Sequence, residues 1–302
     1  MAIHLASKTL AKIEEAIQAD QGASFRAWSQ QILPHMGDAY RTDEFPFRSH
    51  MGASGIGDEC ARKIWYGFRW ATRPSFGGRI LRLFNRGHLE EARFIAMLLM
   101  IGCEVYQQDA DGNQFTISDA EGHFGGSGDG IVVNLPDLPF GTQALCEFKT
   151  SAEKGFLKLK KEGVRENKPE HYVQMQCYMR KMGIAAALYM VVNKNTDELY
   201  GEIIMLDTEV ADHFINRGQV LVWKESAKSV QRISESPSWY QCKFCDHNKT
   251  CHRDKAPDSN CRTCIHSMPS ANKKWVCNNQ MDTPSLTKEE QLEGCINYER
   301  LF

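Results

Sequence analysis

The stretch Gly125–Thr150, GGSGDGIVVNLPDLPFGTQALCEFKT, decides the fold that the sequence predicts. Asp129 lies between two glycines at the start of a short apolar run that reads as a strand. Eighteen residues later, Glu147 lies in QALCEFKT, which reads as a second strand. A hairpin-like connection between the two strands would bring Asp129 beside Glu147, so the sequence predicts a pair of neighbouring carboxylates.

The second strand also carries a charged pair. Side chains alternate along a strand, so Glu147 and Lys149 share one face with Leu145, and Cys146 and Phe148 share the other. A carboxylate and an ammonium on a mostly buried strand are costly unless they have a partner or a task. The face with Glu147 is therefore the candidate functional face.

Paired carboxylates with a nearby lysine suit phosphodiester hydrolysis. Asp129 and Glu147 would bind one or two divalent cations, because Mg²⁺ prefers hard oxygen ligands. Such a cation acidifies a bound water and stabilises charge on the phosphate, and Lys149 would orient the water or offset that charge. The alternative is a solvated hairpin with an ordinary salt bridge, because G-D-G turns and E-x-K strands are common.

A third carboxylate is expected on a helix over about Leu81–Met100. Helical spacing puts Glu91 on one apolar stripe with Phe84, Gly87, His88, Phe94, Ile95 and Leu98. Glu90 is expected to face outward. Buried carboxylates are rare unless they are paired or bound to a metal, so Glu91 is a candidate ligand. His88 is expected to be packed or hydrogen-bonded.

The surrounding pattern is that of an α/β domain. Strand-like runs and helical segments follow one another between residues 59 and 238. A helical extension and loop are expected over residues 1–58, and a Cys-rich metal-binding module over 239–302. The expected strands are CEVYQQ, NQFTI, DGIVVN, QALCEFKT, AALYMVVN and ELYGEIIML. The expected later helices lie around Phe156–Lys161, over Pro169–Lys181 and over about Thr208–Arg232.

Four motifs follow one another along the chain. They are G-x-x-x-E with Gly87 and Glu91, G-x-x-D-G over 126–130, E-F-K over 147–149, and Q-x-x-x-Y with Gln174 and Tyr178. In this order they resemble the RecB-like PD-(D/E)XK nucleases over roughly residues 54–251. That family includes the AddB nuclease domain, the CRISPR-adaptation nucleases and many phage recombination exonucleases. The resemblance implies a restriction-endonuclease-like α/β core, a central mixed sheet flanked by helices.

The resemblance also assigns roles. It implies that Asp129 and Glu147 bind Mg²⁺ or Mn²⁺, that Glu91 assists and that Lys149 positions the water. Gln174 and Tyr178 would organise the site and contact DNA. Many relatives carry a metal-binding histidine in the first motif, whereas here His88 directly follows the glycine. We therefore prefer Glu91 to His88 as the ligand.

Seven of the 11 cysteines fall in the last 61 residues, a density that favours metal ligands in a reducing compartment. Cys242, Cys245 and Cys251 follow the spacing C-x2-C-x5-C, with Cys60 far upstream. Three close cysteines and a distant one resemble the iron–sulfur staple of the AddB and CRISPR-adaptation nucleases. Four thiolates suit a 4Fe-4S cluster, and a structural zinc ion is the alternative.

Cys261, Cys264, Cys277 and Cys295 make up a second set in the tail. The C-x2-C pair is a zinc half-site, and the set predicts a zinc-ribbon-like module with structural Zn²⁺. In the alternative, His252 or His266 replaces a cysteine, or the two sets share ligands. Cys103, Cys146 and Cys177 read as ordinary core residues.

The chain of 302 residues has a formal charge of −2, which argues against an overall nucleic-acid footprint but not against a local one. Basic residues flank the motifs, before the first-motif helix and after E-F-K, and predict phosphate contacts without sequence reading. They are Arg79, Arg82, Arg86, Lys158, Lys160, Lys161, Arg165 and Lys168. No apolar run is long enough for a membrane span, and no secretory signal is expected.

The sequence thus predicts a metal-dependent deoxyribonuclease, an exonuclease acting on single strands or duplex ends in recombination, repair or phage DNA processing. The expected location is the cytoplasm of a bacterial or phage-infected cell. Its partners would include a helicase, a recombinase or a single-strand-annealing protein, but no membrane. The rivals are a structure-specific or CRISPR-adaptation-type endonuclease on the same core, and a non-catalytic nuclease-like protein that binds DNA or a partner.

Overall fold

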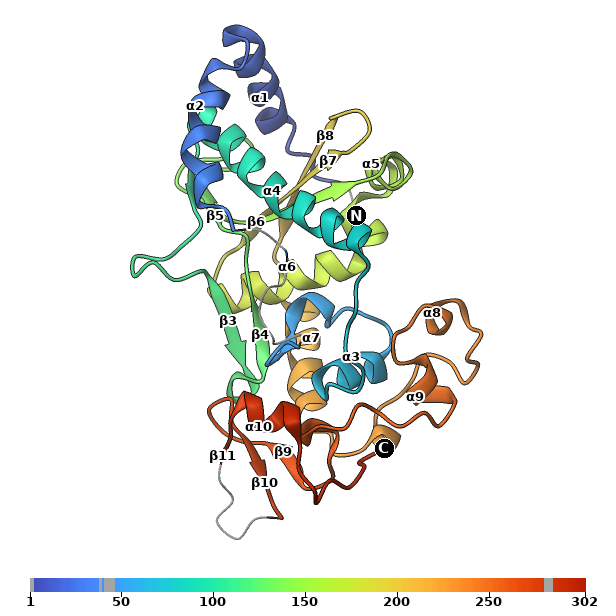
Figure 1. Cartoon of the computed structure of the whole chain (residues 1–302). Coiled ribbons are helices and arrows are strands. Elements are labelled where there is room, and N and C mark those ends of the chain that lie inside the picture. Colours follow the sequence, from blue (N-terminus) through green and yellow to red (C-terminus); the bar gives the residue numbers. More distant parts are fainter. Residues whose placement is uncertain (1–2, 38–39, 41–46, 280–284) are drawn as a thin grey trace. The chain divides into compact units, whose positions relative to one another are not determined.

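The structure, a computed structural model, describes residues 3–37, 40, 47–279 and 285–302. The chain forms two compact units, each assembled from three separate segments (Figure 1). Unit 1 comprises Met1–Thr42, Phe76–Ile117 and Ser127–Asp212. Unit 2 comprises Asp43–Ser75, Ser118–Gly126 and His213–Phe302.

Unit 1 is built on a five-stranded mixed sheet with the strand order β2-β5-β6-β7-β8. Only β6 and β7 are parallel, and the other neighbours are antiparallel. The strands are β2 (Glu104–Tyr106), β5 (Ile131–Val133), β6 (Gln143–Ser151), β7 (Ala186–Asn193) and β8 (Leu199–Met205). The expectation of a mixed sheet flanked by helices is confirmed.

Helices cover both faces of this sheet (Figure 1). They are α1 (Ser7–Asp20), α2 (Ala23–Ile32), α4 (Gly78–Met100), α5 (Glu153–Asn167) and α6 (Pro169–Met182), with the 3₁₀ turn η1 (Leu33–His35) after α2. Phe148 of β6 stacks on Phe94 of α4, with ring centroids 5.1 Å apart. Glu147 points to the opposite face, where it meets Gln174 of α6. The predicted alternation along β6 is therefore confirmed.

The N-terminal helices belong to the core of unit 1. Ala6 and Ile13 are buried in the same apolar cluster as Phe94 and Phe148. The carboxylate of Asp137 accepts hydrogen bonds from the backbone N–H groups of Lys8 (3.0 Å) and Thr9 (2.7 Å) at the start of α1. The sequence treats residues 1–58 as an extension beside the core, whereas here α1 and α2 cover part of it.

Unit 2 combines two small sheets with short helices. The sheets have the strand orders β1-β4-β3 and β11-β10-β9. The strands are β1 (Met51–Gly52), β3 (Thr116–Asp119), β4 (Phe124–Ser127), β9 (Ser267–Pro269), β10 (Trp275–Cys277) and β11 (Ser285–Leu286). The α-helices are α3 (Ala61–Phe68), α8 (Tyr240–Lys243), α9 (Asn248–His252) and α10 (Lys288–Glu293). The 3₁₀ turns are η2 (Ala53–Gly55), η3 (Ala120–Gly122), η4 (Ala227–Ser229) and η5 (Cys261–Thr263).

The units cut across the three consecutive regions expected from the sequence. Residues 47–75, which carry Cys60, belong to the same unit as the Cys-rich tail, and a side chain of the tail binds their backbone. Arg262 of the tail donates hydrogen bonds to the carbonyl oxygens of Phe68 (3.1 Å) and Ser49 (3.0 Å). Unit 2 is thus closed by contacts between residues about 200 positions apart, which a local pattern does not encode.

The helix expected over Thr208–Arg232 is shorter in the structure. Helix α7 spans Thr208–Val222. The carbonyl oxygen of Lys224 accepts instead from Trp65 Nε1 (3.0 Å) and Arg69 Nη2 (3.2 Å) of unit 2. Tertiary hydrogen bonds therefore replace the next helical turn. Among the described residues, no helix is both long and apolar enough to cross a membrane.

Candidate active site

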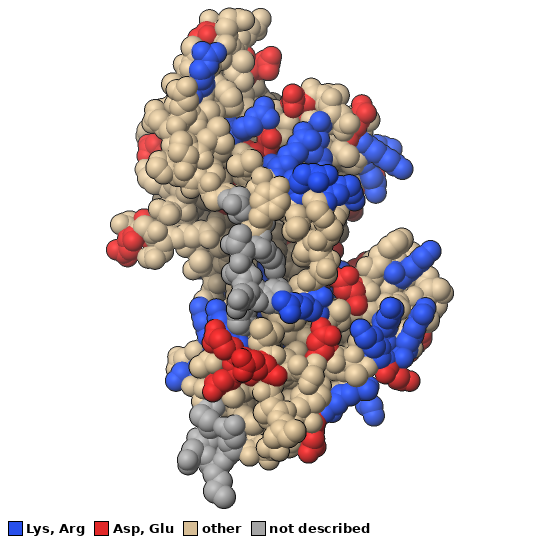
Figure 2. All heavy atoms as spheres, viewed as in Figure 1, with Lys and Arg blue, Asp and Glu red and all other residues tan. Residues whose placement is uncertain are grey.

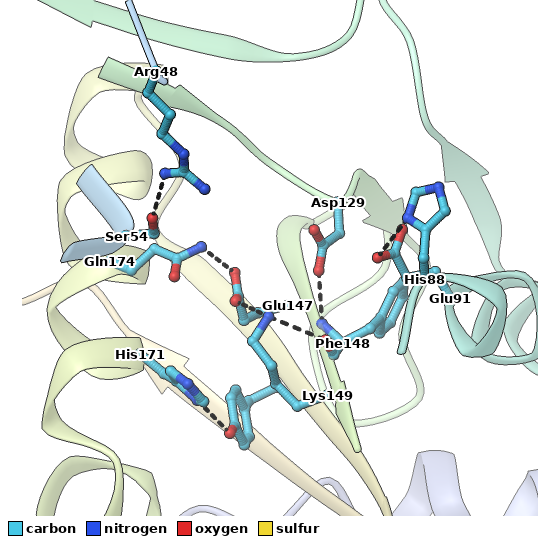
Figure 3. Close-up of polar contacts among 11 residues, drawn as sticks. Arg48, Ser54, His88, Glu91, Asp129, Glu147, Phe148, Lys149, His171 and Gln174 are labelled. Carbon is cyan, nitrogen blue, oxygen red and sulfur yellow. Dashed lines mark hydrogen bonds and ion pairs between the residues drawn. The ribbon is translucent and has the colours of Figure 1, made fainter. Parts of the chain in front are cut away.

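Strand β6 carries Glu147 and Lys149 on the face covered by α6. The side chain of Glu147 is completely buried. Its Oε2 accepts a hydrogen bond of 2.9 Å from Gln174 Nε2, and the Lys149 ammonium contacts its other oxygen (Figure 3). Lys149 Nζ also donates to the carbonyl oxygen of Phe148 (3.1 Å). A buried carboxylate and its ammonium partner thus form the centre of the site.

Asp129 reaches this centre from the turn before β5. Gly130, next to it, has a φ of +150°, and a Cβ there would lie 2.8 Å from the carbonyl oxygen of Tyr106. Only glycine allows the chain to pass so close to β2. Asp129 Oδ2 then accepts from the backbone N–H of Phe148 at 2.9 Å. The structure therefore brings Asp129 beside the strand of Glu147, as the hairpin predicts.

Glu91 completes the group from α4. It interacts electrostatically with Asp129 and Lys149, and its Oε1 lies 3.4 Å from His88 Nδ1 (Figure 3). One expectation about this helix is wrong. Glu90 is the more buried carboxylate, with 8% of its side chain exposed against 25% for Glu91, and it pairs with Arg93 at 3.1 Å. Helix α2 also packs on α4, so more of α4 is covered than a single apolar stripe indicates.

The electrostatics of the site favour a bound cation. Burial raises the pKa of Glu91 to about 8, and the Asp129 carboxylate adds to the effect. Burial likewise raises the pKa of Glu147 to about 7, although Lys149 opposes this shift. Burial alone would lower the pKa of Lys149, but Glu147 and Asp129 raise it overall. Three carboxylates thus share one ammonium, and a divalent cation would relieve their mutual repulsion.

The residue types suit such a cation. Carboxylate oxygens are the ligands that Mg²⁺ and Mn²⁺ prefer, and the buried Glu147 has little access to water that could solvate its charge. In the part of the chain that the structure describes, no group of three or more His, Cys, Asp or Glu side chains is already arranged to hold a metal ion. Cation binding would therefore require Lys149 and the carboxylates to move.

His171 and Tyr189 lie beside this centre, and the four sequence motifs include neither of them. His171 lies one turn before Gln174 on α6, and its Nδ1 is 2.7 Å from the hydroxyl of Tyr189 (Figure 3). Tyr189 of β7 is the register partner of Glu147. Burial, aided by Lys149, lowers the pKa of His171 to about 3, so its ring is neutral. The i, i+3 spacing to Gln174 is the one signal that could have indicated it.

Tyr178, the last residue of the predicted motifs, is 2% exposed. It lies one turn after Gln174 on α6 and is buried below the surface of unit 1. Its side chain therefore supports the helix from inside, and a direct DNA contact would need this region to open.

Basic side chains gather on unit 1 over α5 (Figure 2). Lys158, Lys160 and Lys161 of α5 are exposed, as are Arg79, Arg82 and Arg86 of α4. Some are partly neutralised, since Lys160 lies 2.5 Å from Glu198 and Lys158 lies 3.5 Å from Glu162. Arg165 lies 3.5 Å from Asp207, and Lys168 caps the start of α6. The surface can attract phosphates, although the ion pairs weaken its charge.

Unit 1 also has a larger cavity of about 510 Å³ between α5 and β8, lined by Glu162, Arg165, Glu202 and Asp207 among others. Three of its carboxylates already have partners, since Glu162 lies 3.5 Å from Lys158 and Asp207 lies 3.5 Å from Arg165. Glu202 accepts from the Tyr200 hydroxyl (2.5 Å) and the backbone N–H of Val164 (2.9 Å). The cavity is therefore a less suitable reaction site than the carboxylate group on β6.

Both cysteine sets lie in unit 2. In the first thiol set, Cys60 interacts electrostatically with Cys242 and Cys245, and Cys251 with Cys242. Arg232 Nη1 donates to the carbonyl oxygen of Cys251 at 3.0 Å. In the second thiol set, Cys261, Cys264, Cys277 and Cys295 line one cavity. The side chains of each set therefore lie near one another, and that either set binds a metal ion stays a prediction.

No family model and no curated relative matches the chain. The alkaline exonuclease LHK-Exo from Laribacter hongkongensis is similar in structure, with 18% identity and a TM-score of 0.42 over 57% of this chain and 86% of that chain. The structure of LHK-Exo in complex with dAMP has 17% identity to this chain and a TM-score of 0.43, over the same shares of the two chains. SSO0001 has 14% identity to this chain and a TM-score of 0.39, over 76% of this chain and 97% of that chain. Likeness at this level does not assign a function.

Proposed function

We propose that this protein is a divalent-metal-dependent DNA nuclease. The observation that carries the proposal is the fully buried Glu147, held by Gln174 and contacted by Lys149, with Asp129 and Glu91 beside it. Ionised groups are rarely placed in a protein interior without a task, because their desolvation costs several kcal/mol. Phosphodiester hydrolysis uses this combination of oxygen ligands and a cationic side chain.

The side chains have distinct roles in this proposal. Glu147, Asp129 and Glu91 would hold Mg²⁺ or Mn²⁺, which neutralises charge on the phosphate and makes a bound water more acidic. The Gln174 amide orients the Glu147 carboxylate, and the Phe148 N–H orients Asp129. The raised pKa of Lys149 keeps its ammonium protonated at neutral pH. Lys149 therefore positions the water or offsets phosphate charge, and it does not act as the base.

We propose DNA as the substrate and exonucleolytic attack on single strands or duplex ends as the reaction. The exposed basic residues of α4 and α5 would contact phosphates, which gives affinity without reading sequence. The order of the four motifs, which resembles that of the phage recombination exonucleases, favours this mode over recognition of a fixed site.

The first thiol set would hold the iron–sulfur cluster that the same resemblance implies, with zinc as the alternative ion. Its four cysteines come from the start of α3 and from residues 242–251, so a cluster there would tie these two segments of unit 2 together. Thiolates are negatively charged, and Arg232 lies beside the set. Brown protein that contains iron and acid-labile sulfide, and that is bleached in Cys242→Ser, would support the cluster.

The nuclease proposal is tested with end-labelled single- and double-stranded DNA in Mg²⁺ or Mn²⁺. Wild-type protein should release nucleotides from the ends, and Asp129→Asn should abolish release while the melting temperature stays within a few degrees. Glu15→Gln on the exposed side of α1 is the matched control and should cleave normally. Cleavage that persists in the Asp129→Asn, Glu147→Gln double variant would place the active site elsewhere.

Covalently closed circular DNA separates the alternatives. An exonuclease leaves circles intact, whereas a structure-specific or CRISPR-adaptation-type endonuclease opens them. DNA binding without cleavage of any substrate, in protein with verified metal content, would favour the non-catalytic rival.

A further inference from the structure

The second thiol set surrounds a small cavity in unit 2. Cys261, Cys264, Cys277 and Cys295 all line it, together with His266. These cysteines are spread over 35 residues of sequence, and three elements deliver them: η5, β10 and the turn after α10. The thiol of Cys261 interacts electrostatically with the other three. Four thiols from separate elements thus line one cavity, although among the described residues they do not yet stand in metal-binding positions.

The cavity is the size of one ion. Its volume is about 20 Å³, and a void must offer roughly 10–15 Å³ to hold a single water molecule. A void of this size suits a single ion better than a four-iron cluster with its four sulfides. A single metal ion with four sulfur ligands would fit, and Zn²⁺ is the ion that takes four cysteines in tetrahedral structural sites.

The chain turns at residues 261–264, and the segment that follows α10 returns to this turn. The N–H of Cys264 donates to the carbonyl oxygen of Cys261 at 3.1 Å. Gly294, with a φ of +69°, ends α10 and directs the chain back. Beyond Cys295, the N–H of Leu301 donates to the carbonyl oxygen of Thr263 at 2.9 Å. The last ligand is therefore held against the first two by hydrogen bonds.

The same turn inserts a charged side chain into the interior. Arg262, between Cys261 and Cys264, is 1% exposed and lies 3.8 Å from the ring centroid of Trp70 and 4.5 Å from that of Trp275. Its guanidinium donates to carbonyl oxygens and to the amide oxygen of Gln291 (2.9 Å), which are uncharged acceptors. A second buried arginine, Arg69, donates to the carbonyl oxygens of Arg262 (3.4 Å) and Ser267 (3.1 Å).

The thiols and the buried arginine depend on the same turn. Arg262 lies between Cys261 and Cys264 in the chain, so the backbone that positions the two thiols also positions the guanidinium. Burying a guanidinium is costly, and it requires the hydrogen bonds that this turn allows Arg262 to make. A metal ion held by the set would therefore fix the backbone around Arg262.

We propose that Cys261, Cys264, Cys277 and Cys295 bind one structural Zn²⁺ ion, which fixes the turn that buries Arg262 against α3 and Trp70. As the side chains stand, Cys261 Sγ donates to the carbonyl oxygen of Glu290 at 3.3 Å. The thiols therefore turn toward the cavity and lose their protons when the ion binds. This site is independent of the proposed nuclease activity and of the first thiol set.

The test compares the two C-x2-C pairs in the full-length protein. Cys264→Ser should lose one zinc ion per chain and keep the metal of the first thiol set. Cys245→Ser, the matched control, should lose the metal of the first set, iron or zinc, and keep one zinc ion per chain. Metal content is measured by mass spectrometry after gel filtration. A zinc content of Cys264→Ser equal to that of wild type, or no zinc left in Cys245→Ser, would overturn the proposal.

A second measurement needs no variant. In the native wild-type protein, the four thiols should resist alkylation and become reactive together when zinc is removed with a chelator. Exchange of the zinc for Co²⁺ should give the strong visible absorption of a tetrahedral thiolate site. Two disulfides among the four cysteines in protein purified without oxygen, or zinc retained by Cys295→Ser but lost by His266→Ala, would show that this ligand set is wrong.

Discussion

Unit 1 and unit 2 bury charge by different means. In unit 1 an apolar core packs against the sheet, and the buried acidic side chains are Glu147 of the site on β6, Glu90 with its partner Arg93, and Glu202 with its hydrogen bonds from Tyr200 and Val164. In unit 2 the buried charges are two arginines among aromatic rings, beside two sets of thiols. Apolar burial is enough to fold the first unit, whereas the second combines small sheets with groups suited to soft metals. On the proposals above, metal would serve chemistry in unit 1 and stability in unit 2.

The largest expected effect is the loss of metal from the thiol sets. Apparent binding free energies of structural zinc are on the order of 10 kcal/mol, so a thiol-directed chelator should unfold much of unit 2. Limited proteolysis should then cut within residues 239–302, while hydrogen exchange of β6 and β7 in unit 1 stays slow. Equal loss of protection in both units would contradict the comparison.

The second effect concerns the carboxylate site alone. Glu147→Gln keeps the shape of the side chain and its contact with Gln174, but it removes the buried negative charge. We expect the cleavage rate to fall by about 10²–10³-fold or more, as when one electrostatic group of an active site is removed. The metal content of the thiol sets should not change. Single-turnover cleavage measures the rate, and metal analysis on the same sample measures the metal content.

The third prediction concerns pH: as the pH rises, the stability of the metal-free protein should fall and the activity in Mg²⁺ should increase. Without metal, Glu91 and Glu147 have folded-state pKa values of about 8 and about 7, above the ordinary 4.5. Their protonation favours the folded state at low pH, and this contribution is lost as pH rises through 7 to 8. The metal-free melting temperature should therefore fall between pH 5 and pH 8.

Activity in Mg²⁺ should rise over the same range, because the ligands must be ionised to bind the cation. For one required proton loss, the rate would change by about tenfold per pH unit on the acid side. Melting curves with and without Mg²⁺, beside cleavage rates at each pH, decide the matter. A metal-free melting temperature that rises with pH would show that protonation of these two carboxylates does not control the stability of the fold.

The smallest effect separates two adjacent residues of α4. Glu91→Gln should lower the rate by about tenfold and raise the Mg²⁺ concentration needed, because it removes one charge from the cation site. Glu90→Gln should leave the rate unchanged and cost about 1 kcal/mol in unfolding free energy, because its buried carboxylate loses the ion pair with the half-exposed Arg93. A larger loss of rate in Glu90→Gln than in Glu91→Gln would mean that Glu90, and not Glu91, contributes to the cation site.

Local patterns in the sequence were enough for most of unit 1. The alternation in QALCEFKT placed Glu147 and Phe148 on opposite faces of β6, and the glycines around Asp129 indicated the turn. A strand has a period of two residues and a tight turn needs a positive φ, so both features are encoded by neighbours in sequence. The strand Ala186–Asn193 and the start of α6 at Pro169 followed for the same reason.

Only the tertiary structure decided which neighbours cover these elements. Glu90 is buried because more than one face of α4 is covered, and α7 ends early because Trp65 and Arg69 bind the carbonyl oxygen of Lys224. His171 meets Tyr189 because α6 packs on β7. Burial depends on the distant segment that packs on a residue, and a local pattern contains no information about that segment.

The cysteines show both sides of this division. Their spacing in the sequence predicted two sets, because thiolate ligands recur in C-x2-C pairs whatever the fold. The tertiary structure decided that residues 47–75 join the tail, that the second set lines a cavity of about 20 Å³, and that Arg262 of the same turn is buried. The sequence determined which side chains could act as ligands, and the folded chain determined how much space they enclose and which elements bring them together.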